Sequence, residues 1–315
     1  MNPELEVTAA AQGGVFSRRQ ALAAGYTQAQ IRERLTDGRW RRLRRGQYAA
    51  ASKFGHLPSW RRRTAEHLEL VHAAVNSMSP GMVAVSHQSA LALHRVPVWD
   101  ASMDEVHVTR VDRAGGRSLA GVRHHNGLLA ADDLCEVEGL LVTTPARAAF
   151  EFACTTGFES AVVSFDAVLA AGAMTPADGD RLLAATAFWP GSPTARAARR
   201  FATGLSESVG ESRLRVLMAN HGLPPPALQV ELADPTGTFA RVDFYFPENR
   251  TVVEFDGLVK YAAGGAEVLA REKVREDRLR ALGLQVVRIT WSDLSDPAVV
   301  VGRIRQAFDR ARKTA

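Results

Sequence analysis

The chain has 315 residues, of which 46% are hydrophobic and 23% are charged. This composition is typical of a globular protein long enough for two or three domains. It contains only two cysteines, Cys135 and Cys154, and no CxxC pair, which argues against a disulfide framework and a structural zinc site. The N-terminal MNPELEV lacks the order of a signal peptide, and no long apolar run occurs, so we expect a cytoplasmic protein without a membrane span.

Positive charge is concentrated near the N-terminus. Residues 18–63 contain thirteen Arg or Lys side chains against two acids, Glu33 and Asp37, so this segment carries a charge of +11. The whole chain carries +5, and the remainder therefore carries −6. Such a concentrated field is typical of a module that binds a polyanion. A solvated arginine-rich face is the alternative interpretation.

The basic segment predicts two short helices and a hairpin. Ser17 is a suitable N-cap for the first helix and Gly25 ends it, while Thr27 caps the second helix, TQAQIRERL. After Gly38, WRRLRRGQYAA predicts a basic two-stranded ribbon that turns at Gly46. This is the order of a winged helix, in which the second helix enters the major groove and the wing contacts phosphates. The DNA-binding candidates on these elements are Gln28, Gln30, Arg32, Arg34, Arg39, Arg41, Arg42, Arg44 and Arg45.

The segment GVFSRRQALAAGYTQAQIRERLTDGRWRRLRRGQYA resembles the N-terminal winged helix of AbiE-type antitoxins, the DNA-binding autorepressors of type IV toxin–antitoxin systems. This resemblance implies double-stranded DNA as a partner and a cognate toxin protein as a possible second one. The later pattern SHQSALALH…VHVT…VTTPARAAFEFA resembles the segment that follows the winged helix in AbiE-like proteins. We interpret residues 59–200 as an α+β connector or interaction domain.

Histidines are frequent in the middle region, but their spacing does not predict a metal site. His124 and His125 are adjacent, so on a strand they point to opposite sides. His87 and His94 are seven residues apart and would lie on one helix face, where core or capping roles are more common. GGRSLAG lacks the GK[ST] ending of a phosphate-binding loop.

Residues 201–315 predict a third domain with a clear order of elements. A helix ends at Gly222, and three strand candidates follow: ALQVELAD, FARVDFYF and TVVEFDG. An amphipathic helix then ends at Gly283, before the strand LQVVRITW and a closing helix. The order is αβββαβ with a trailing helix.

Carboxylates interrupt two of these apolar strands. If PENR is the loop, Phe246 pairs with Thr251, which places Asp243 opposite Glu254. Alternation puts one set of side chains on one face, namely Asp243, Tyr245, Glu254 and Asp256. It puts a second set on the core face, namely Val242, Phe244, Phe246, Val253 and Phe255. Opposed carboxylates repel one another unless a cation lies between them, and Mg²⁺ prefers such oxygen ligands.

Two further groups complete this predicted site. Glu211 lies on the preceding helix, and Lys260 follows Asp256 closely. Acids that hold a metal, with a cation to stabilise developing charge, are what metal-assisted phosphodiester cleavage requires. The long helix adds more cations: Arg271, Lys273, Arg275, Arg278 and Arg280.

The phrase ESRLR…RVDFYFPENRTVVEFDG…REKVREDRLRALGLQVVRITWSDL resembles the PD-(D/E)XK nuclease superfamily, in its branch related to very-short-patch-repair endonucleases. The resemblance implies Glu211, Asp243 and Glu254 as metal-associated acids. Asp256 stands where the superfamily usually has lysine, and the related branch commonly has aspartate at this position too. Asp256 would then be a ligand, and Lys260 or Lys273 would supply the positive charge.

The sequence thus predicts a multidomain α/β protein, with a winged helix at 1–58, an α+β region at 59–200 and a nuclease-like domain at 201–315. The leading hypothesis is an endonuclease that depends on Mg²⁺ or Mn²⁺ and is recruited to DNA by its winged helix. The alternative is a non-catalytic AbiE-like antitoxin or repressor with a degenerate nuclease fold. The sequence does not determine the oligomeric state.

Overall fold

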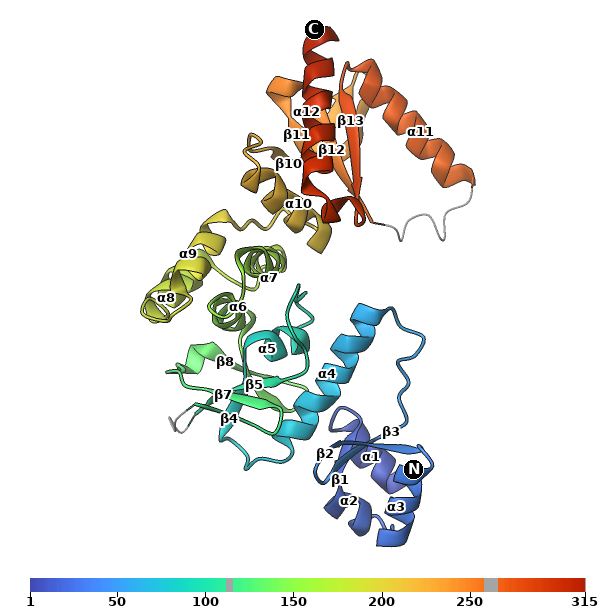
Figure 1. Ribbon diagram of the computed structural model, residues 1–315, viewed down its shortest axis with the longest axis vertical. Coiled ribbons are helices and arrows are strands. Elements are labelled where there is room, and N and C mark those ends of the chain that lie inside the picture. The colour runs from blue at the N-terminus through green and yellow to red at the C-terminus, as the bar shows by residue number, and fades with distance from the viewer. Residues whose placement is uncertain (112–115, 258–265, 315) are drawn as a thin grey trace. The chain divides into compact units, whose positions relative to one another are not determined.

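The computed structural model describes residues 1–111, 116–257 and 266–314 (Figure 1). By contact, the chain divides into two compact units. One consists of Met1–Ser164 with Ala173–Arg199, and the other of Phe165–Gly172 with Arg200–Ala315. The fold is of the mixed α/β multidomain class that the sequence predicts, whereas the three-domain division stays a prediction. Within the described ranges, no helix is both long enough and apolar enough to cross a membrane.

The N-terminal region has the predicted winged-helix order. Its elements are α1 (Pro3–Ala10), β1 (Val15–Ser17), α2 (Arg18–Ala23), α3 (Gln28–Thr36), β2 (Trp40–Arg44) and β3 (Gln47–Ala50). The sheet has the order β1-β3-β2, and β2 and β3 form the antiparallel wing (Figure 1). Both predicted N-caps are present, because Ser17 and Thr27 each form a capping box with the glutamine three residues later. Ile31 and Trp40 are buried in a small core that fixes α3 against the wing.

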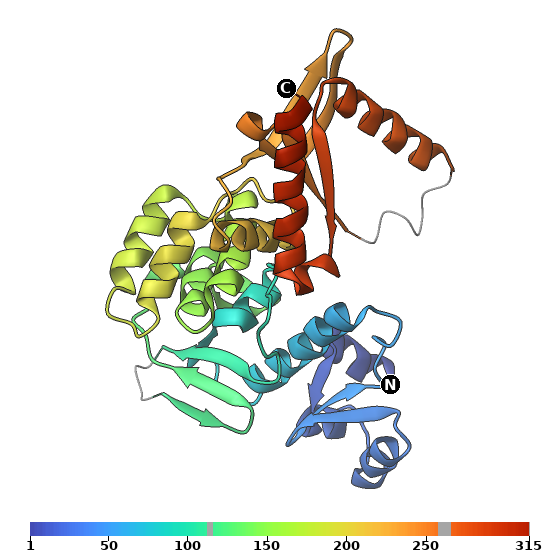
Figure 2. The same ribbon diagram turned by 45° about the horizontal axis from the view of Figure 1, so that its top comes forward.

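The middle region is an α+β arrangement. Its elements are α4 (Ser59–Val75), β4 (Val83–Val85), α5 (His87–Leu93), β5 (Val106–Arg110), β6 (Arg117–Leu119), β7 (Val122–His125), β8 (Leu134–Val137), β9 (Leu140–Thr143), α6 (Pro145–Ala153), α7 (Phe158–Ala170), α8 (Pro176–Ala185) and α9 (Ser192–Phe201). The sheet has the order β6-β7-β5-β4-β9-β8. Helices α6, α8 and α9 gather beside it (Figure 2). Pro145 occupies the first turn of α6, as predicted.

The C-terminal region also follows the predicted order. Its elements are α10 (Val209–Asn220), β10 (Ala227–Asp234), β11 (Gly237–Phe246), β12 (Thr251–Asp256), α11 (Ala266–Ala281), β13 (Gln285–Thr290) and α12 (Pro297–Thr314). The sheet order is β10-β11-β12-β13, and only its last pair, β12 with β13, is parallel among the strands described. A parallel pair requires a crossover, which here runs through α11.

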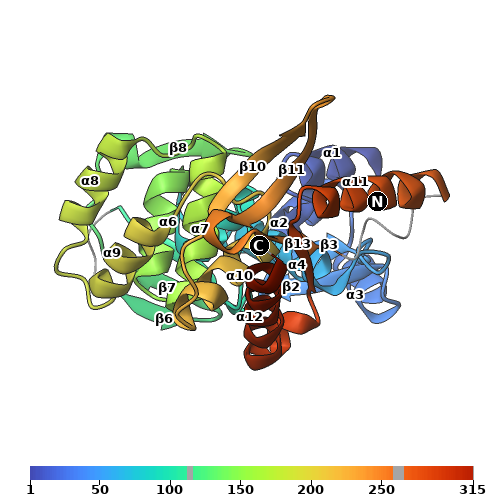
Figure 3. The ribbon, with the colours of Figure 1, turned by 90° about the horizontal axis from the view of Figure 1, so that it is seen from above.

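Helices cover both faces of this sheet (Figure 3). Side chains of α10 and α12 share one core cluster with Phe244, Val253 and Phe255, whereas Leu279 of α11 belongs to a second cluster. The face predicted to be acidic is therefore largely apolar as well. The placement of Val242 was wrong, because it packs in the α11 cluster and not with Phe244.

A buried ion pair ties the end of α7 to the C-terminal unit. Asp166 accepts hydrogen bonds from Arg215 Nη2, at 2.8 and 2.9 Å, and from the Ser212 hydroxyl at 2.7 Å. Its carboxylate also accepts from the Thr203 backbone N–H at 2.8 Å. A buried carboxylate requires such compensation. These bonds explain why residues 165–172 belong to this unit.

Candidate functional site

The strands β11 and β12 bring the first acid into place. Phe246 pairs with Thr251, as predicted, and the antiparallel register continues to Phe244 and Val253. One step further, the Asp243 carboxylate accepts the Phe255 backbone N–H at 2.8 Å. Asp243 therefore bonds the backbone of the strand that carries Glu254.

Gln229 links Asp243 to the acid on the neighbouring helix. Its Nε2 lies 3.1 Å from Glu211 Oε2 and 3.4 Å from Asp243 Oδ1. Glu211 also accepts hydrogen bonds from the Ser208 hydroxyl at 2.8 Å and from the Glu207 N–H at 2.9 Å. Burial raises the pKa of Glu211, and the nearby Asp243 charge raises it further, while the bond from the Glu207 N–H lowers it. The predicted approach of Glu211 to the strand acids is thus present.

Glu254 is a buried acid with a strongly raised pKa. It is 8% exposed, and burial raises its pKa to about 7, with a further contribution from the Asp243 charge. Arg275 of α11 forms an ion pair with its Oε1 and lowers the pKa, and Nε of Arg288 lies 3.8 Å from its Oε2. We call Glu211, Asp243 and Glu254 the acid cluster. Because a cation favours ionised carboxylates, a bound divalent ion would relieve both the burial cost and the repulsion.

The remaining predicted residues lie less centrally. Asp256 is half-buried at the end of β12, level with Thr290 of β13, and Lys273 is exposed on α11. Lys260 lies outside the described residues. Within the described ranges, no three acids bring one oxygen each within 4.8 Å of one another. The acid cluster thus has the donor chemistry for Mg²⁺, but Arg275 would have to leave Glu254 before the oxygens could converge.

Gln229 and the roles of Arg275 and Arg288 were missed in the sequence. Gln229 lies level with Asp243, between the pairs Leu228–Phe244 and Val230–Val242. An irregularity between Leu232 and Ala233 shifts the register, so counting back from the turn would assign the wrong partner. Gln229 also has a φ of 51°, which interrupts the regular pleat beside Asp243. The ion pair from Arg275 depends on how α11 packs, which no local pattern encodes.

At the N-terminal end, α3 and the wing present exposed polar side chains. Gln28 and Arg32 are exposed on α3, and Arg42 and Arg45 are exposed on the wing. Gln28 Oε1 accepts a hydrogen bond from Arg18 Nη2 at 3.0 Å. These side chains are placed where a winged helix contacts bases and phosphates.

Three other candidates on α3 and the turn after it make contacts within the protein. Gln30 completes the capping box with Thr27, and the guanidinium of Arg34 lies over the Tyr26 ring. Arg39 bonds Glu33 at 2.7 Å and also bonds Asp37.

On the wing, Arg41 pairs with Glu69 of α4 at 2.6 Å. Arg44 is half-buried, and burial lowers its pKa. Both charges contribute to the basic field, but Arg41 is committed to its ion pair with Glu69.

The class of protein follows from these two regions: a winged-helix chain that also carries an α/β unit with the acid cluster. Residues 5–51 match the family described as "Transcriptional regulator, AbiEi antitoxin". This match covers the winged helix, so the N-terminal part of the predicted resemblance is confirmed. The nuclease part has no such match to support it.

Two relatives are uncharacterized proteins of Mycobacterium tuberculosis, MT2308 of strain CDC 1551 and Rv2248 of strain H37Rv. Each is 35% identical over 180 residues, which is 57% of this chain and 66% of the relative. The chain thus spans slightly less than two thirds of each relative's length. The shared stretch is far longer than residues 5–51, so the similarity extends beyond the winged helix.

Proposed function

We propose that the protein is a DNA-binding transcriptional regulator of the AbiE antitoxin type, which contacts duplex DNA through α3 and its wing. The observation that carries this proposal is the exposure of Arg32, Arg42 and Arg45 on a winged helix that matches the AbiEi regulator family. The segment's charge of +11 provides attraction to phosphates, independent of DNA sequence. A cognate toxin is the proposed protein partner.

The test is binding of the full chain to the DNA upstream of its own gene, measured by fluorescence anisotropy against a scrambled duplex. We expect preference for the upstream DNA. We expect Arg42→Gln and Arg45→Gln each to weaken binding and to reduce the salt slope by about one. Arg312→Gln, which removes an exposed charge from α12, is the matched control. Equal affinity for both duplexes, or equal effects of all three variants, would contradict the proposal.

A second candidate function is metal-dependent DNA cleavage by the C-terminal unit, and the acid cluster favours it. Asp243 and Glu254 would hold Mg²⁺ or Mn²⁺, with Asp256 as a further ligand and Glu211 assisting. Such an ion supplies charge neutralisation at the scissile phosphate. Gln229 positions Glu211 and Asp243. Once released from Glu254, Arg275 would stabilise the developing negative charge, the role predicted for Lys260 or Lys273.

Plasmid nicking with Mg²⁺ or Mn²⁺ separates this candidate from a purely regulatory role. We expect nicking by the wild type and its loss in Asp243→Asn and Glu254→Gln, which keep the shape of the side chains. Glu231→Gln is the matched control, because Glu231 is an exposed acid on the neighbouring strand β10. Nicking that survives both cluster variants would contradict the site. Specific DNA binding without nicking would contradict the cleavage proposal and support only the regulatory function.

A further inference from the structure

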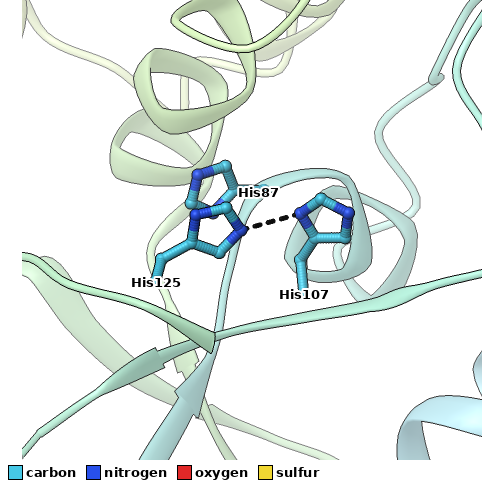
Figure 4. A group of neighbouring side chains, drawn as sticks. All are labelled: His87, His107 and His125. Carbon is cyan, nitrogen blue, oxygen red and sulfur yellow. Dashed lines mark hydrogen bonds between the residues drawn. The ribbon is translucent and has the colours of Figure 1, made fainter. Parts of the chain in front are cut away.

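A set of histidines from separate elements meets in the middle region. His87 begins α5, His107 lies on β5 and His125 ends β7 (Figure 4). One ring nitrogen from each lies within 4.8 Å of the others, and His107 Nδ1 is 2.9 Å from His125 Nε2. The rings of His87 and His125 stack with their centroids 3.7 Å apart. We call these residues the histidine cluster. It is the sole group of this kind in the part of the chain that the structure describes.

The spacing of the histidines in the sequence did not predict this cluster. The expectation that the adjacent His124 and His125 point to opposite sides of a strand agrees with the structure. His124 and His125 alternate along β7, where His124 is buried and His125 is half-buried. His94 does not join His87, because its Nε2 bonds the Thr143 carbonyl at 2.8 Å. His125 instead meets His107 because β5 and β7 pair in parallel with Thr109 level with His125. That places His107 two residues away in register, on the same face.

The cluster is held in the uncharged form that ligates metals. Burial lowers the pKa of His107 to about 3 and that of His125 to about 4, and the pKa of His87 is also well below its usual value. Repulsion among the rings and from Arg123 acts in the same direction. Neutral imidazole keeps a lone pair, so a metal ion would not have to displace a proton from a histidinium.

Gln88 next to the cluster has an unsatisfied acceptor. Gln88 is 7% exposed, and within the described residues its Oε1 has no hydrogen-bond partner, while its Nε2 lies 2.9 Å from His107 Nε2. Rotating the amide by half a turn gives up a 3.4 Å contact with the Ser102 carbonyl. It places Oε1 to accept a hydrogen bond from the His107 Nε2–H, which leaves the lone pair of His107 Nδ1 free to bind a metal. A metal-bound histidine typically donates its other N–H to such an oxygen.

The backbone of His87 has an uncommon conformation at the position from which its ring joins the histidine cluster. His87 has a φ of 53°, in the left-handed region, and its N–H donates to Glu151 Oε2 at 3.2 Å. The buried Glu151 carboxylate is fixed by Arg147 at 3.0 Å and by the Thr143 hydroxyl at 3.1 Å. A strained residue persists only where its surroundings determine it, and such residues gather at functional sites. Glu151 also lies 3.9 Å from His87 Nδ1, where it would offset the charge of a cation.

We propose that the histidine cluster binds one divalent transition-metal ion. Zn²⁺ and Co²⁺ are the expected ions, because both bind imidazole nitrogen well. Bonds of about 2.0–2.1 Å in a tetrahedral site would separate the ligand nitrogens by roughly 3.4 Å. In the structure one pair of ring nitrogens is 2.9 Å apart and all three lie within 4.8 Å of one another, so a metal ion would require only small shifts of the rings. Three imidazole ligands leave a fourth position for water or a small anion. This site differs from the acid cluster, whose oxygen ligands suit harder ions.

The test is titration of the purified, metal-stripped full chain with Co²⁺, followed by visible absorption. We expect one equivalent to produce the ligand-field bands of a low-coordinate nitrogen site and Zn²⁺ to abolish them. His107→Gln and His125→Gln should each weaken Zn²⁺ binding by at least about tenfold, since loss of even an outer partner of a metal ligand costs about that much.

Two control variants and one independent spectrum test whether the bands arise from the histidine cluster. His94→Gln keeps a donor to Thr143, and Asp243→Asn alters the acid cluster, so both should leave the bands unchanged. If the histidine variants do not fold, Cu²⁺ electron paramagnetic resonance of the wild type decides, because three bound nitrogens give a resolved superhyperfine pattern. Absence of nitrogen-derived signals in the wild type, or bands that persist in His107→Gln, would overturn the proposal and leave a hydrogen-bonded imidazole chain.

Discussion

The acid cluster and the histidine cluster are both small groups of buried and half-buried titratable side chains, but burial acts on their pKa values in opposite directions. It raises the pKa of Glu254 to about 7 and lowers that of His107 to about 3. In each case the uncharged form is favoured. The acids still attract a counter-ion, Arg275, whereas the histidines are neutral at pH 7 and need none. A buried cluster can therefore be stable without a ligand, by two different routes.

The largest expected effect concerns the ion network behind the histidine cluster. Arg147 is 1% exposed and pairs with Asp133 and Glu151, both at 3.0 Å. Arg147→Leu should lower the unfolding free energy by about 3–5 kcal/mol, because it removes the buried arginine that pairs with both carboxylates and breaks the ion pair of the fully buried Glu151. Hydrogen-exchange mass spectrometry in urea resolves this change within the N-terminal unit. Arg181→Leu is the control, since Arg181 also pairs with Asp133 but is 38% exposed, and it should cost about 1 kcal/mol or less.

The second effect is a dependence of stability on pH that arises from the raised pKa of Glu254. Because the folded pKa of Glu254 is raised from 4.5 to about 7, its protonated form contributes stability that is complete below pH 4.5. That contribution is lost as the pH rises through 7. With a chelator present, the wild type should lose up to about 3 kcal/mol relative to Glu254→Gln over this range. A constant difference between the two proteins in urea titrations across these pH values would refute the assignment.

A third test separates packing from charge at the acid cluster. A methyl group on Gly210 of α10 would meet Phe255 Cε1 at 1.9 Å, beneath the strand that carries Glu254. Gly210→Ala should therefore destabilise the C-terminal unit by about 1–3 kcal/mol. Gly302→Ala in α12 meets nothing within 4 Å and should stabilise by up to about 1 kcal/mol. Fluorescence of Trp291, which packs on Phe255, reports both changes, and equal effects would contradict this account.

The smallest effect concerns the helix that carries Glu211. The Ser208 hydroxyl accepts the Glu211 N–H at 3.1 Å and donates to its carboxylate at 2.8 Å. Ser208→Ala should cost about 1 kcal/mol of unfolding free energy, whereas Ser208→Asn, a good N-cap, should restore most of it. Thermal unfolding measures both. A cost that asparagine does not reduce would show that the bond to the carboxylate matters more than the cap.

Local chemistry made much of the fold predictable. The caps at Ser17 and Thr27, the wing turn at Gly46 and the order of the C-terminal elements follow from residues close together in sequence. Phe246 pairs with Thr251 because a short connection between antiparallel strands fixes their register. Counting residues back from this turn did not predict that the Asp243 carboxylate, one position beyond the Phe244–Val253 pair, bonds the backbone N–H of Phe255.

Predictions that depended on distant packing were incomplete. The placement of Val242 was wrong because α11 covers the second face of the sheet with its own apolar side chains. Three of the seven basic residues assigned to DNA, Arg34, Arg39 and Arg41, contact partners within the protein, as Arg41 does with Glu69 on α4. Their charge was evident in the sequence, but their partners were not.

The sequence by itself determined the winged helix, the positive charge beside it and the acids on two paired strands, because neighbours along the chain set caps, turns and register. Only the tertiary structure decided which buried groups meet. The packing of α11 gives Glu254 an arginine, and the parallel pairing of β5 with β7 gives His107 a second histidine. Long-range contacts of this kind arise from the packing of whole elements, so no spacing of residues in one stretch encodes them.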